Sequence, residues 1–495
     1  MASYNKKEHL KANIEAIKTV FALHREQRTA TPEERTILEA YTGFGALKCI
    51  LSPANTMEDI ARWNKSELEL FPLVMELHSI IRDNTASESQ YKSYMQSLKN
   101  SVMTAFYTPA PIVREIAVAL QEAGIVPKRI LDPSAGMGEF IRSFDAIAAE
   151  GHTTFGFEKD ILTGQMLSAL YPENKIRIRG FEEIESKFGG YFDVVSSNIP
   201  FGDMAVFDPV FSKTDEPARK VSRMSLHNYF FVKGLDCLRE GGLLAFITSR
   251  GVADSPTNAP IREYLMEHSR LVSALRLPDG MFSENAGTEV GSDLLILQKE
   301  TGKGVQNELE QLFAQSVSIE LGGEVFTENA LFAEGNHSVA TAYRIGTDTY
   351  GKPAPVYIHT GGIEGIARDL EARISADMAA RFDQKIYRSG LSEAVESEAV
   401  TLAPEGVPVL TLQQQYEVPE PTNSQPDMEP PREMNGQTVY FDEEHHPVTD
   451  RERQAEAETS LFAPEAYTDW QRNVARVNRE IAEGFSLRSE GGVWL

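Results

Sequence analysis

Residues 191–203 read Tyr-Phe-Asp-Val-Val-Ser-Ser-Asn-Ile-Pro-Phe-Gly-Asp. The apolar run predicts a buried strand, and the change to Asn, Pro and Gly predicts that this strand ends near Asn198. Open α/β sheets bind ligands beyond the carboxyl ends of their strands. There an Asn oxygen and a neighbouring backbone carbonyl can accept hydrogen bonds from an exocyclic amine, while Phe201 can stack on the ring that carries it. The stretch therefore predicts a site for an amine-bearing aromatic ring.

A second segment, residues 129–140, reads Arg-Ile-Leu-Asp-Pro-Ser-Ala-Gly-Met-Gly-Glu-Phe. Its apolar start predicts a short strand, and Gly136 and Gly138 allow a tight turn and the close approach of a ligand to the backbone. Helical periodicity resumes at Phe140. This order of strand, Gly-rich turn and helix is typical of nucleotide-type sites. It is not the dinucleotide fingerprint, however, and the chain has no P-loop motif.

The surrounding chain alternates between strand and helix signals. Helices are expected between the early strands and also over 225–238 and 259–267. This alternation predicts an α/β fold with a doubly wound, mostly parallel, seven-stranded sheet. No clear helix separates the last two strands, so these should form an antiparallel edge. The expected strands lie near 129–132, 154–158, 176–179, 192–197, 243–248, 271–277 and 290–298.

Four segments in this order resemble the adenine-specific DNA methyltransferases, which are class I S-adenosylmethionine-dependent enzymes with a gamma-type segment order. They are residues 106–109, residues 131–138, the strand ending at Glu158, and residues 197–201. The resemblance implies the catalytic residues Asn198, Ile199, Pro200 and Phe201. It also implies that S-adenosyl-L-methionine is bound by Phe106, Tyr107, Thr108, Pro109, Asp132, Pro133, Ala135, Gly136, Gly138, Glu158 and Phe181.

The chain departs from the family pattern at two positions. Ile199 stands where the family has its first Pro, but the role of that residue is carried by a backbone carbonyl, which Ile also has. Gly180 stands where the family usually has Asp. One cofactor contact is then missing, or Glu182 or Glu183 supplies it.

The implied reaction transfers a methyl group to the amino group of adenine in a flipped-out DNA base, with no metal. Asn198 and the Ile199 carbonyl would hold the amine, and Phe201 would stack on the base. Methylation of the cytosine amino group uses nearly the same chemistry. Attack at cytosine carbon needs a thiolate, whereas Cys49 and Cys237 are expected to be packing residues. Alternatives are a methyltransferase-like binding module without activity, or an enzyme acting on RNA or on a protein amide.

Residues 198–203 and the stretch Tyr41-Thr42-Gly43-Phe44-Gly45-Ala46-Leu47 resemble the methylase region of large methylase/helicase-like proteins of bacterial mobile elements. The resemblance implies a restriction-modification setting, with DNA as partner. It also implies a helicase-like partner or a C-terminal domain that this chain lacks.

The net charge of −25 is unusual for a protein that binds DNA. Most of it lies outside the region of strand and helix alternation, because residues 301–495 contain 33 acidic and 15 basic side chains. Phosphate contacts depend on local patches, and Lys213, Arg219, Lys220 and Arg223 form a candidate in the segment after the Asn198 stretch. A solvated surface loop would have the same composition.

The composition predicts five regions: helical residues 1–100, a catalytic domain over 101–300, and a small accessory α/β region over 301–390. An acidic, disordered linker over 391–455 and a helical segment over 456–495 follow. Two cysteines, no apolar leader and no membrane-length apolar run predict a cytoplasmic protein. The resemblance implies that it comes from a bacterium, a phage or a mobile element. No spaced Cys/His set predicts a metal site.

Overall fold

The computed structural model describes residues 5–45, 47–51, 60, 63–104, 107–202, 204–282, 291–333, 335–347 and 353–398, together with 432–434, 437–441 and 447–448. The chain forms two compact units, Met1–Leu402 and Ala403–Leu495. In the second unit three short antiparallel strands are described, β12 (Arg432–Met434), β13 (Gln437–Phe441) and β14 (Pro447–Val448). They fall within the predicted linker. The predicted helical segment over 456–495 lies outside the described residues.

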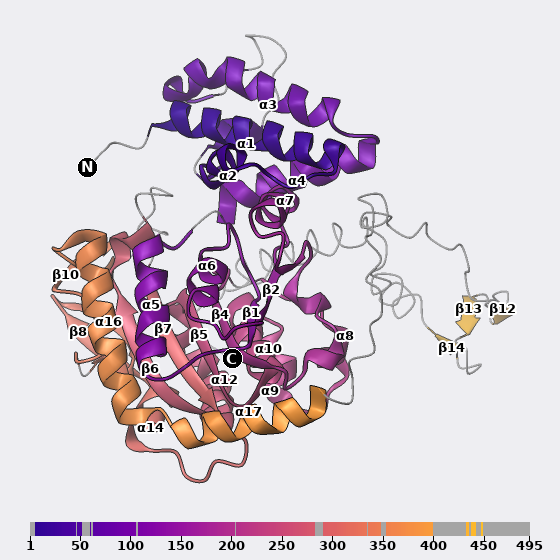
Figure 1. The fold of residues 1–495 in the computed structure, drawn as a ribbon. Coiled ribbons are helices and arrows are strands. Elements are labelled where there is room, and N and C mark those ends of the chain that lie inside the picture. The colour runs from indigo at the N-terminus through magenta and orange to yellow at the C-terminus, as the bar shows by residue number, and fades with distance from the viewer. Residues whose placement is uncertain are drawn as a thin grey trace. The chain divides into compact units, whose positions relative to one another are not determined.

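A seven-stranded sheet forms the centre of the first unit, in the order β3-β2-β1-β4-β5-β7-β6 (Figure 1). Strands β1 to β5 pair in parallel, and β7 runs antiparallel to both β5 and β6. The predicted fold class is confirmed, as is the antiparallel pairing of the last two strands. The strands are β1 (Arg129–Asp132), β2 (Thr153–Phe157), β3 (Lys175–Arg177), β4 (Phe192–Asn198), β5 (Leu238–Ser249), β6 (Ser269–Leu277) and β7 (Ser292–Lys299).

Helices cover both faces of this sheet because its strands are apolar on both sides, as buried parallel strands are. Ile130 and Val194 face α5 (Ala110–Glu122), α6 (Glu139–Asp145) and α16 (Gly362–Arg381). Leu131 and Val195 face the opposite layer, which contains α10 (Leu226–Cys237), α12 (Ala259–His268) and α14 (Glu308–Ala314). Alternate residues of one strand thus belong to two separate cores.

The N-terminal helices are α1 (Lys6–Glu26), α2 (Pro32–Glu39), α3 (Phe71–Asp83) and α4 (Glu88–Thr104). Helix α2 begins with a capping box between Thr31 and Glu34 and has Pro32 in its first turn. Helices α1, α2 and α4 pack on α7 (Ile161–Leu170), the helix that follows β2. Leu162, Met166 and Leu170 of α7 belong to the same apolar core as the N-terminal helices. Tyr41 and Phe44 of the Gly-containing stretch are buried in that core too.

The segment after β7 adds two hairpins and a long helical arm. This segment corresponds to the predicted accessory α/β region over 301–390, and it contains both helices and strands. The elements are β8 (Ser316–Leu321), β9 (Glu324–Asn329), α15 (Ala330–Ala333), β10 (Ala342–Thr347), β11 (Pro353–Ile358) and α17 (Gln384–Glu398), in addition to α14 and α16. None of the helices in the described residues is long and apolar enough to cross a membrane.

One buried carboxylate, that of Asp193, joins the amino ends of the central strands. Its Oδ2 accepts hydrogen bonds from the backbone N–H groups of Lys128 and Arg129, both at 2.8 Å. Its Oδ1 accepts from Arg239 Nε at 2.6 Å and from Arg129 Nη2 at 3.3 Å. Both arginines are buried. The carboxylate therefore pairs with two buried guanidinium groups where β1, β4 and β5 begin.

We expect Asp193→Ala to lower the free energy of unfolding by about 3–5 kcal/mol, because it leaves two buried cations without their carboxylate. Chemical denaturation followed by circular dichroism measures the change. Asp83→Ala, at an exposed position, is the control and should cost less than about 0.5 kcal/mol. A loss below 1 kcal/mol for Asp193→Ala would show that the cluster is not important for stability.

Candidate functional site

Three strand ends meet at one edge of the sheet and form the candidate site. Strand β1 lies between β2 and β4, and all three run in parallel, so Asp132, Glu158 and Asn198 emerge on the same side. Ser197 connects two of these strand ends. Its Oγ donates to Asp132 Oδ1 at 2.7 Å and lies 3.3 Å from the carbonyl oxygen of Ser134. The predicted catalytic strand is thereby attached directly to the predicted cofactor loop.

The loop over residues 133–138 has the backbone conformation that its two glycines predict. Gly136 has φ +52° and Gly138 has φ +85°, a region that L-residues rarely adopt. Ala135 N–H donates to the carbonyl of Phe157 at 2.8 Å, which joins the loop to β2. A Cβ on Gly138 would lie 2.4 Å from Cε2 of Tyr171. Glycine is therefore required at residue 138 both by the backbone and by the neighbouring ring.

Glu158 accepts two backbone hydrogen bonds next to this loop. The N–H of Gly136 donates to Oε2 at 2.9 Å, and the N–H of Asp160 donates to Oε1 at 2.7 Å. Burial, and secondarily the nearby carboxylate of Asp160, raises the pKa of Glu158 to about 8. Burial also raises the pKa of Asp132 to about 7, against the opposing hydrogen bonds from Ser197 and Ser134. The edge thus contains two carboxyl groups whose ionised form is disfavoured without a cationic or hydrogen-bonding partner.

The leading segment, residues 106–109, is described from Tyr107 onward, and Phe106 lies outside the described residues. The Tyr107 ring packs against the Gly-rich loop, since a Cβ on Gly136 would lie 2.9 Å from its Cε1. Thr108 is buried, and Pro109 precedes α5 as its N-cap residue. The structure therefore brings this segment and the loop together, as the predicted cofactor site requires. Pro133 and Ala135 are buried within the loop.

The departure at Ile199 has a structural reason. Its backbone N–H donates to the carbonyl of Ile247 at 3.0 Å, a bond between neighbouring strands that proline cannot make. Its side chain is buried in the core beneath the site. Asn198, Pro200 and Phe201 are each half-buried at the end of β4. Isoleucine therefore extends the pairing of β4 with β5 by one residue.

The departure at Gly180 also has a structural reason. The carboxylate of Glu182 lies over Gly180, where a Cβ would be 2.2 Å from its Oε2. Lys159 donates to the other oxygen of Glu182 at 2.7 Å. A carboxylate thus occupies the space that a side chain on residue 180 would need. Phe181 is buried against Phe157 and Phe230.

The four predicted DNA-binding residues lie on one segment after the site. Lys213 ends α8 (Pro209–Lys213), Arg219 and Lys220 lie on α9 (Pro217–Ser222), and Arg223 follows α9. Lys213 and Lys220 are exposed. Arg219 is half-buried and forms an ion pair with Asp236 at 2.9 Å. Arg219 therefore has a structural partner, while the two lysines face solvent.

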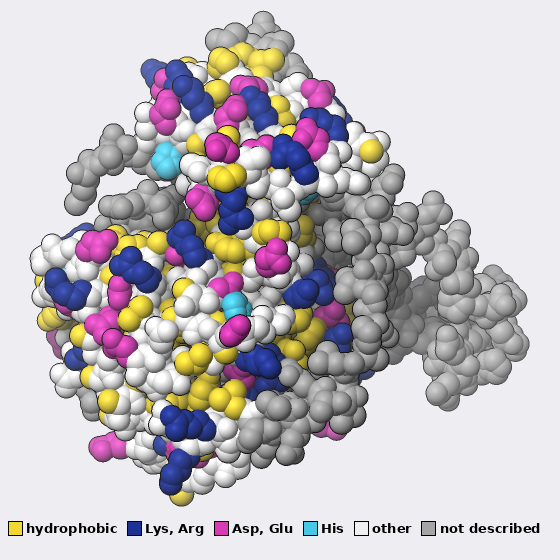
Figure 2. Space-filling model, viewed as in Figure 1, with side chains coloured by type: hydrophobic (Ala, Val, Ile, Leu, Met, Phe, Trp, Pro, Cys, Tyr) yellow, Lys and Arg dark blue, Asp and Glu magenta, His cyan; other side chains and the backbone are white. Residues whose placement is uncertain are grey.

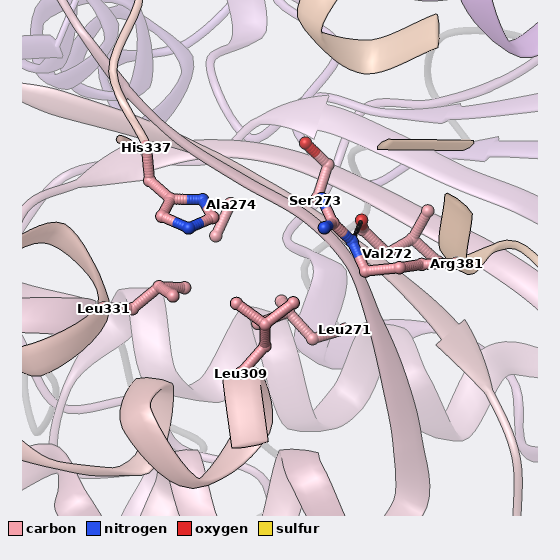
Figure 3. A pocket seen from close by; sticks show the side chains of 8 residues that line it. All are labelled: Leu271, Val272, Ser273, Ala274, Leu309, Leu331, His337 and Arg381. Atoms are coloured by element: carbon pink, nitrogen blue, oxygen red, sulfur yellow. Dashed lines mark hydrogen bonds between the residues drawn. The ribbon is translucent and has the colours of Figure 1, made fainter. Parts of the chain in front are cut away.

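A shallow hollow of about 160 Å³, open to solvent, lies elsewhere, at the outer edge strand β6 (Figure 3). His337, Leu309 and Leu331 face it. The hollow leaves no enclosed room even for a water molecule, and its strand is the third neighbour of β4 in the sheet. It is therefore separate from the candidate site. Cys49 and Cys237 are both buried, as expected for packing residues. Among the described residues no cluster of three or more His, Cys, Asp or Glu side chains could hold a metal ion.

The residues present fit S-adenosyl-L-methionine. Two ribose hydroxyls are natural donors to the Glu158 carboxylate. The Asp132 Oδ2 atom is buried and has no hydrogen-bond partner among the described residues, which suits a cationic donor such as the amino group of the methionine moiety. The positive-φ glycines leave the backbone open to close approach.

We expect the affinity for S-adenosylmethionine to rise between pH 6 and pH 8.5. The bound form favours both ionised carboxylates, so binding releases protons wherever free Asp132 and Glu158 are protonated, below about pH 7 and pH 8. Affinity should fall by up to about tenfold per pH unit for each linked carboxyl as the pH decreases. Calorimetry at pH 6, 7 and 8.5 measures this. Glu158→Gln should reduce the slope, and equal affinity at all three pH values would refute the linkage.

Two contacts were missed by sequence reasoning. Asp208 accepts from Tyr229 Oη at 2.7 Å and from Lys233 Nζ at 2.9 Å, and so anchors the segment that contains the basic residues. Ser197 connects β4 to the loop. The contact of Ser197 could have been suspected only from its position directly before Asn198. Nothing in the sequence near Asp208 indicates that its partners lie on α10.

Residues 89–317 match the family model described as N-6 DNA Methylase. This match confirms the resemblance predicted from the four segments. A stretch of 198 residues is 27% identical to the Defense against restriction protein B of Escherichia phage P1 and covers 40% of this chain. It spans only 8% of the phage protein's length.

Solved structures that resemble this chain include a methyltransferase subunit of the type I restriction-modification system from Streptococcus thermophilus. It is 14% identical at a TM-score of 0.35, with 67% of this chain and 90% of that chain covered. The type I restriction enzyme EcoKI M protein is 12% identical at a TM-score of 0.35, with 81% and 93% covered. Because both TM-scores are below 0.5, the match to the family rests on the sequence.

Proposed function

We propose that this chain, whose residues 89–317 match the N-6 DNA Methylase family, transfers a methyl group from S-adenosylmethionine to the exocyclic amino group of adenine in DNA. The observation that carries the proposal is the bond from Ser197 Oγ to Asp132 Oδ1 at 2.7 Å. It places Asn198, one residue further along β4, beside the loop that would hold the cofactor. An amine bound at Asn198 would then lie close to the methyl donor, as in-line transfer requires.

S-adenosylmethionine supplies the activated methyl group and its leaving group. The protein's part is to orient the amine, whose lone pair is delocalised into the ring and is a poor nucleophile. Hydrogen bonds from the amine to Asn198 Oδ1 and to the backbone carbonyl of Ile199 favour a more tetrahedral nitrogen. The bond from Ile199 N–H to Ile247 holds this backbone in place.

The target nucleotide must leave the base stack before its amine can reach Asn198. Phe201 offers the flipped base a stacking face, and Lys213 and Lys220 are exposed for phosphate contacts nearby in sequence. Basic and acidic side chains are interspersed on the face drawn in Figure 2, so the net charge of −25 does not form one acidic field there. We also expect the chain to act together with a helicase-like partner or a further domain.

The proposal is tested by transfer of labelled methyl from S-adenosylmethionine to unmethylated DNA, with the modified base identified by mass spectrometry. N6-methyladenine is the expected product. If the product is methylated cytosine, the proposed site is retained and only the identity of the target base changes. Methyl transfer to RNA or protein alone would overturn the proposal. Cofactor binding by calorimetry without transfer to any of these acceptors would also overturn it and would indicate a binding module.

A further inference from the structure

Helix α4 of the N-terminal region reaches the candidate site through one buried serine. Ser97 is 3% exposed. Its hydroxyl donates to Asp160 Oδ2 at 2.5 Å and accepts from the backbone N–H of Leu162 at 3.2 Å. Helices α4 and α7 pack against one another (Figure 1). Ser97 therefore attaches the N-terminal helices to the segment that follows Glu158, the predicted ribose carboxylate.

Asp160 is the N-cap residue of α7, and two elements hold it. Its Oδ1 accepts from the backbone N–H of Thr163 at 2.8 Å, as a capping carboxylate does. Its Oδ2 accepts from Ser97 of α4. The same serine satisfies the N–H of Leu162, which belongs to the first turn of α7 and has no acceptor within the helix. A side chain from the N-terminal region therefore completes the start of α7.

The backbone N–H of Asp160 points back to the carboxylate of Glu158. It donates to Oε1 at 2.7 Å, while the N–H of Gly136 in the Gly-rich loop donates to Oε2 at 2.9 Å. Each carboxylate oxygen thus has one backbone donor, and the two donors together fix the plane of the group. An ionised carboxylate has further lone pairs, which remain for two ribose hydroxyls. The position of residue 160 therefore determines how this carboxylate is presented to the ribose.

The Ser97 hydroxyl is an important partner of the half-buried Asp160 carboxylate. Burial raises the pKa of Asp160, and the hydrogen bond from Ser97 is the largest of the effects that oppose this rise. An ionised group that loses a hydrogen-bond partner away from water pays the desolvation cost of the missing bond. We expect Asp160 to move toward solvent when the Ser97 hydroxyl is removed, and its backbone N–H to move with it.

We propose that Ser97 and Asp160 are positioning residues for S-adenosylmethionine. The hydroxyl of Ser97 holds Asp160, and the backbone N–H of Asp160 holds the Glu158 carboxylate in the orientation that binds the ribose hydroxyls. Both residues act through Glu158. The inference rests on the cofactor part of the proposed function, and it makes helix α4 of the N-terminal region a part of the cofactor site.

The test is a double-mutant cycle between Ser97→Ala and Glu158→Ala, with S-adenosylmethionine binding measured by calorimetry. At pH 8.5 Glu158, whose pKa is about 8, is mostly ionised, so a change in its ionisation has little effect on affinity. Ser97→Ala should weaken binding about tenfold, a loss like that of groups that orient a metal ligand. In the Glu158→Ala background the same change should cost less than twofold, because its effect passes through that carboxylate.

Ser101→Ala is the matched control, because Ser101 lies one turn further along α4 and is also buried. Its Oγ accepts from the backbone N–H of Phe44 at 3.0 Å, a bond that does not lead to Asp160. Ser101→Ala should therefore change the affinity for S-adenosylmethionine less than twofold. Circular dichroism checks the fold of each variant. If Ser97→Ala does not fold, Ser97→Cys replaces it, since a thiol is only a weak donor.

Three outcomes would overturn the positioning role while leaving the proposed function standing. They are unchanged affinity in Ser97→Ala, an equal loss in Ser101→Ala, and a further tenfold loss when Ser97→Ala is added to Glu158→Ala. If the wild type binds S-adenosylmethionine but methylates no DNA, the proposed reaction fails, and the same cycle still decides the positioning role. If the wild type binds no S-adenosylmethionine, both proposals are wrong.

Discussion

Asn198→Ala is expected to lower the rate of methyl transfer by about a hundredfold to a thousandfold, the range for loss of one preorganised hydrogen-bonding group. The variant removes the side-chain oxygen that would accept from the target amine. It leaves the Ser197 bond to Asp132 and the loop over residues 133–138 in place. The affinity for S-adenosylmethionine should therefore change less than twofold. Single-turnover transfer and calorimetry on the same preparation measure the two quantities.

Asn198→Asp is the matched variant for this prediction. A carboxylate keeps two acceptor oxygens at the end of β4, and the family pattern admits Asp at this position, so part of the rate should return. A rate for Asn198→Ala within threefold of the wild type would exclude the proposed role of this residue. Loss of cofactor binding together with the rate would show that the substitution damaged the loop instead.

Gly138→Ala has the second large expected effect, because it combines a strained backbone with a collision. The residue has φ +85°, and the added Cβ would lie 2.4 Å from Cε2 of Tyr171 and 2.8 Å from Cδ1 of Leu167. The loop must shift to relieve these contacts. The affinity for S-adenosylmethionine should fall at least about tenfold, and the free energy of unfolding should fall by about 1–3 kcal/mol.

Gly151→Ala separates the two causes. Gly151 also has a positive φ, +71°, but nothing lies within 4 Å of a Cβ built there. It should therefore show the backbone cost of about 1 kcal/mol and normal cofactor affinity. Calorimetry and chemical denaturation are applied to both variants. Equal behaviour of the two would mean that the contact with Tyr171 does not control the loop.

The sheet was predictable because its strands are short apolar runs that end in recognisable turn chemistry. Residues 192–198 and 129–132 illustrate this, since each strand ends where Asn, Pro or Gly first breaks the run. The place of β7 between β5 and β6 was harder to predict. An antiparallel return needs no helix, and nothing local to residues 292–299 says on which side of β6 they pair.

The sequence predicted which segments form the candidate site, but it did not predict the hydrogen bonds and contacts between them. Asp132 and Ser197 are 65 positions apart, and their hydrogen bond exists only because β1 and β4 are neighbours. The position of Glu182 over Gly180 depends on the backbone of residues 180–183, which form a short 3-10 turn. The predicted catalytic and cofactor roles themselves remain predictions until the variants are measured.

The burial of α7 between two layers has a consequence for how such proteins are inherited. Its outer face packs against α1, α2 and α4, and Met137 of the Gly-rich loop lies at the border of that same core. A recombination event that transferred only the sheet and its own helices would leave this face of α7 open to water. A methylase module transferred without the N-terminal helices should therefore be less stable than one transferred with them.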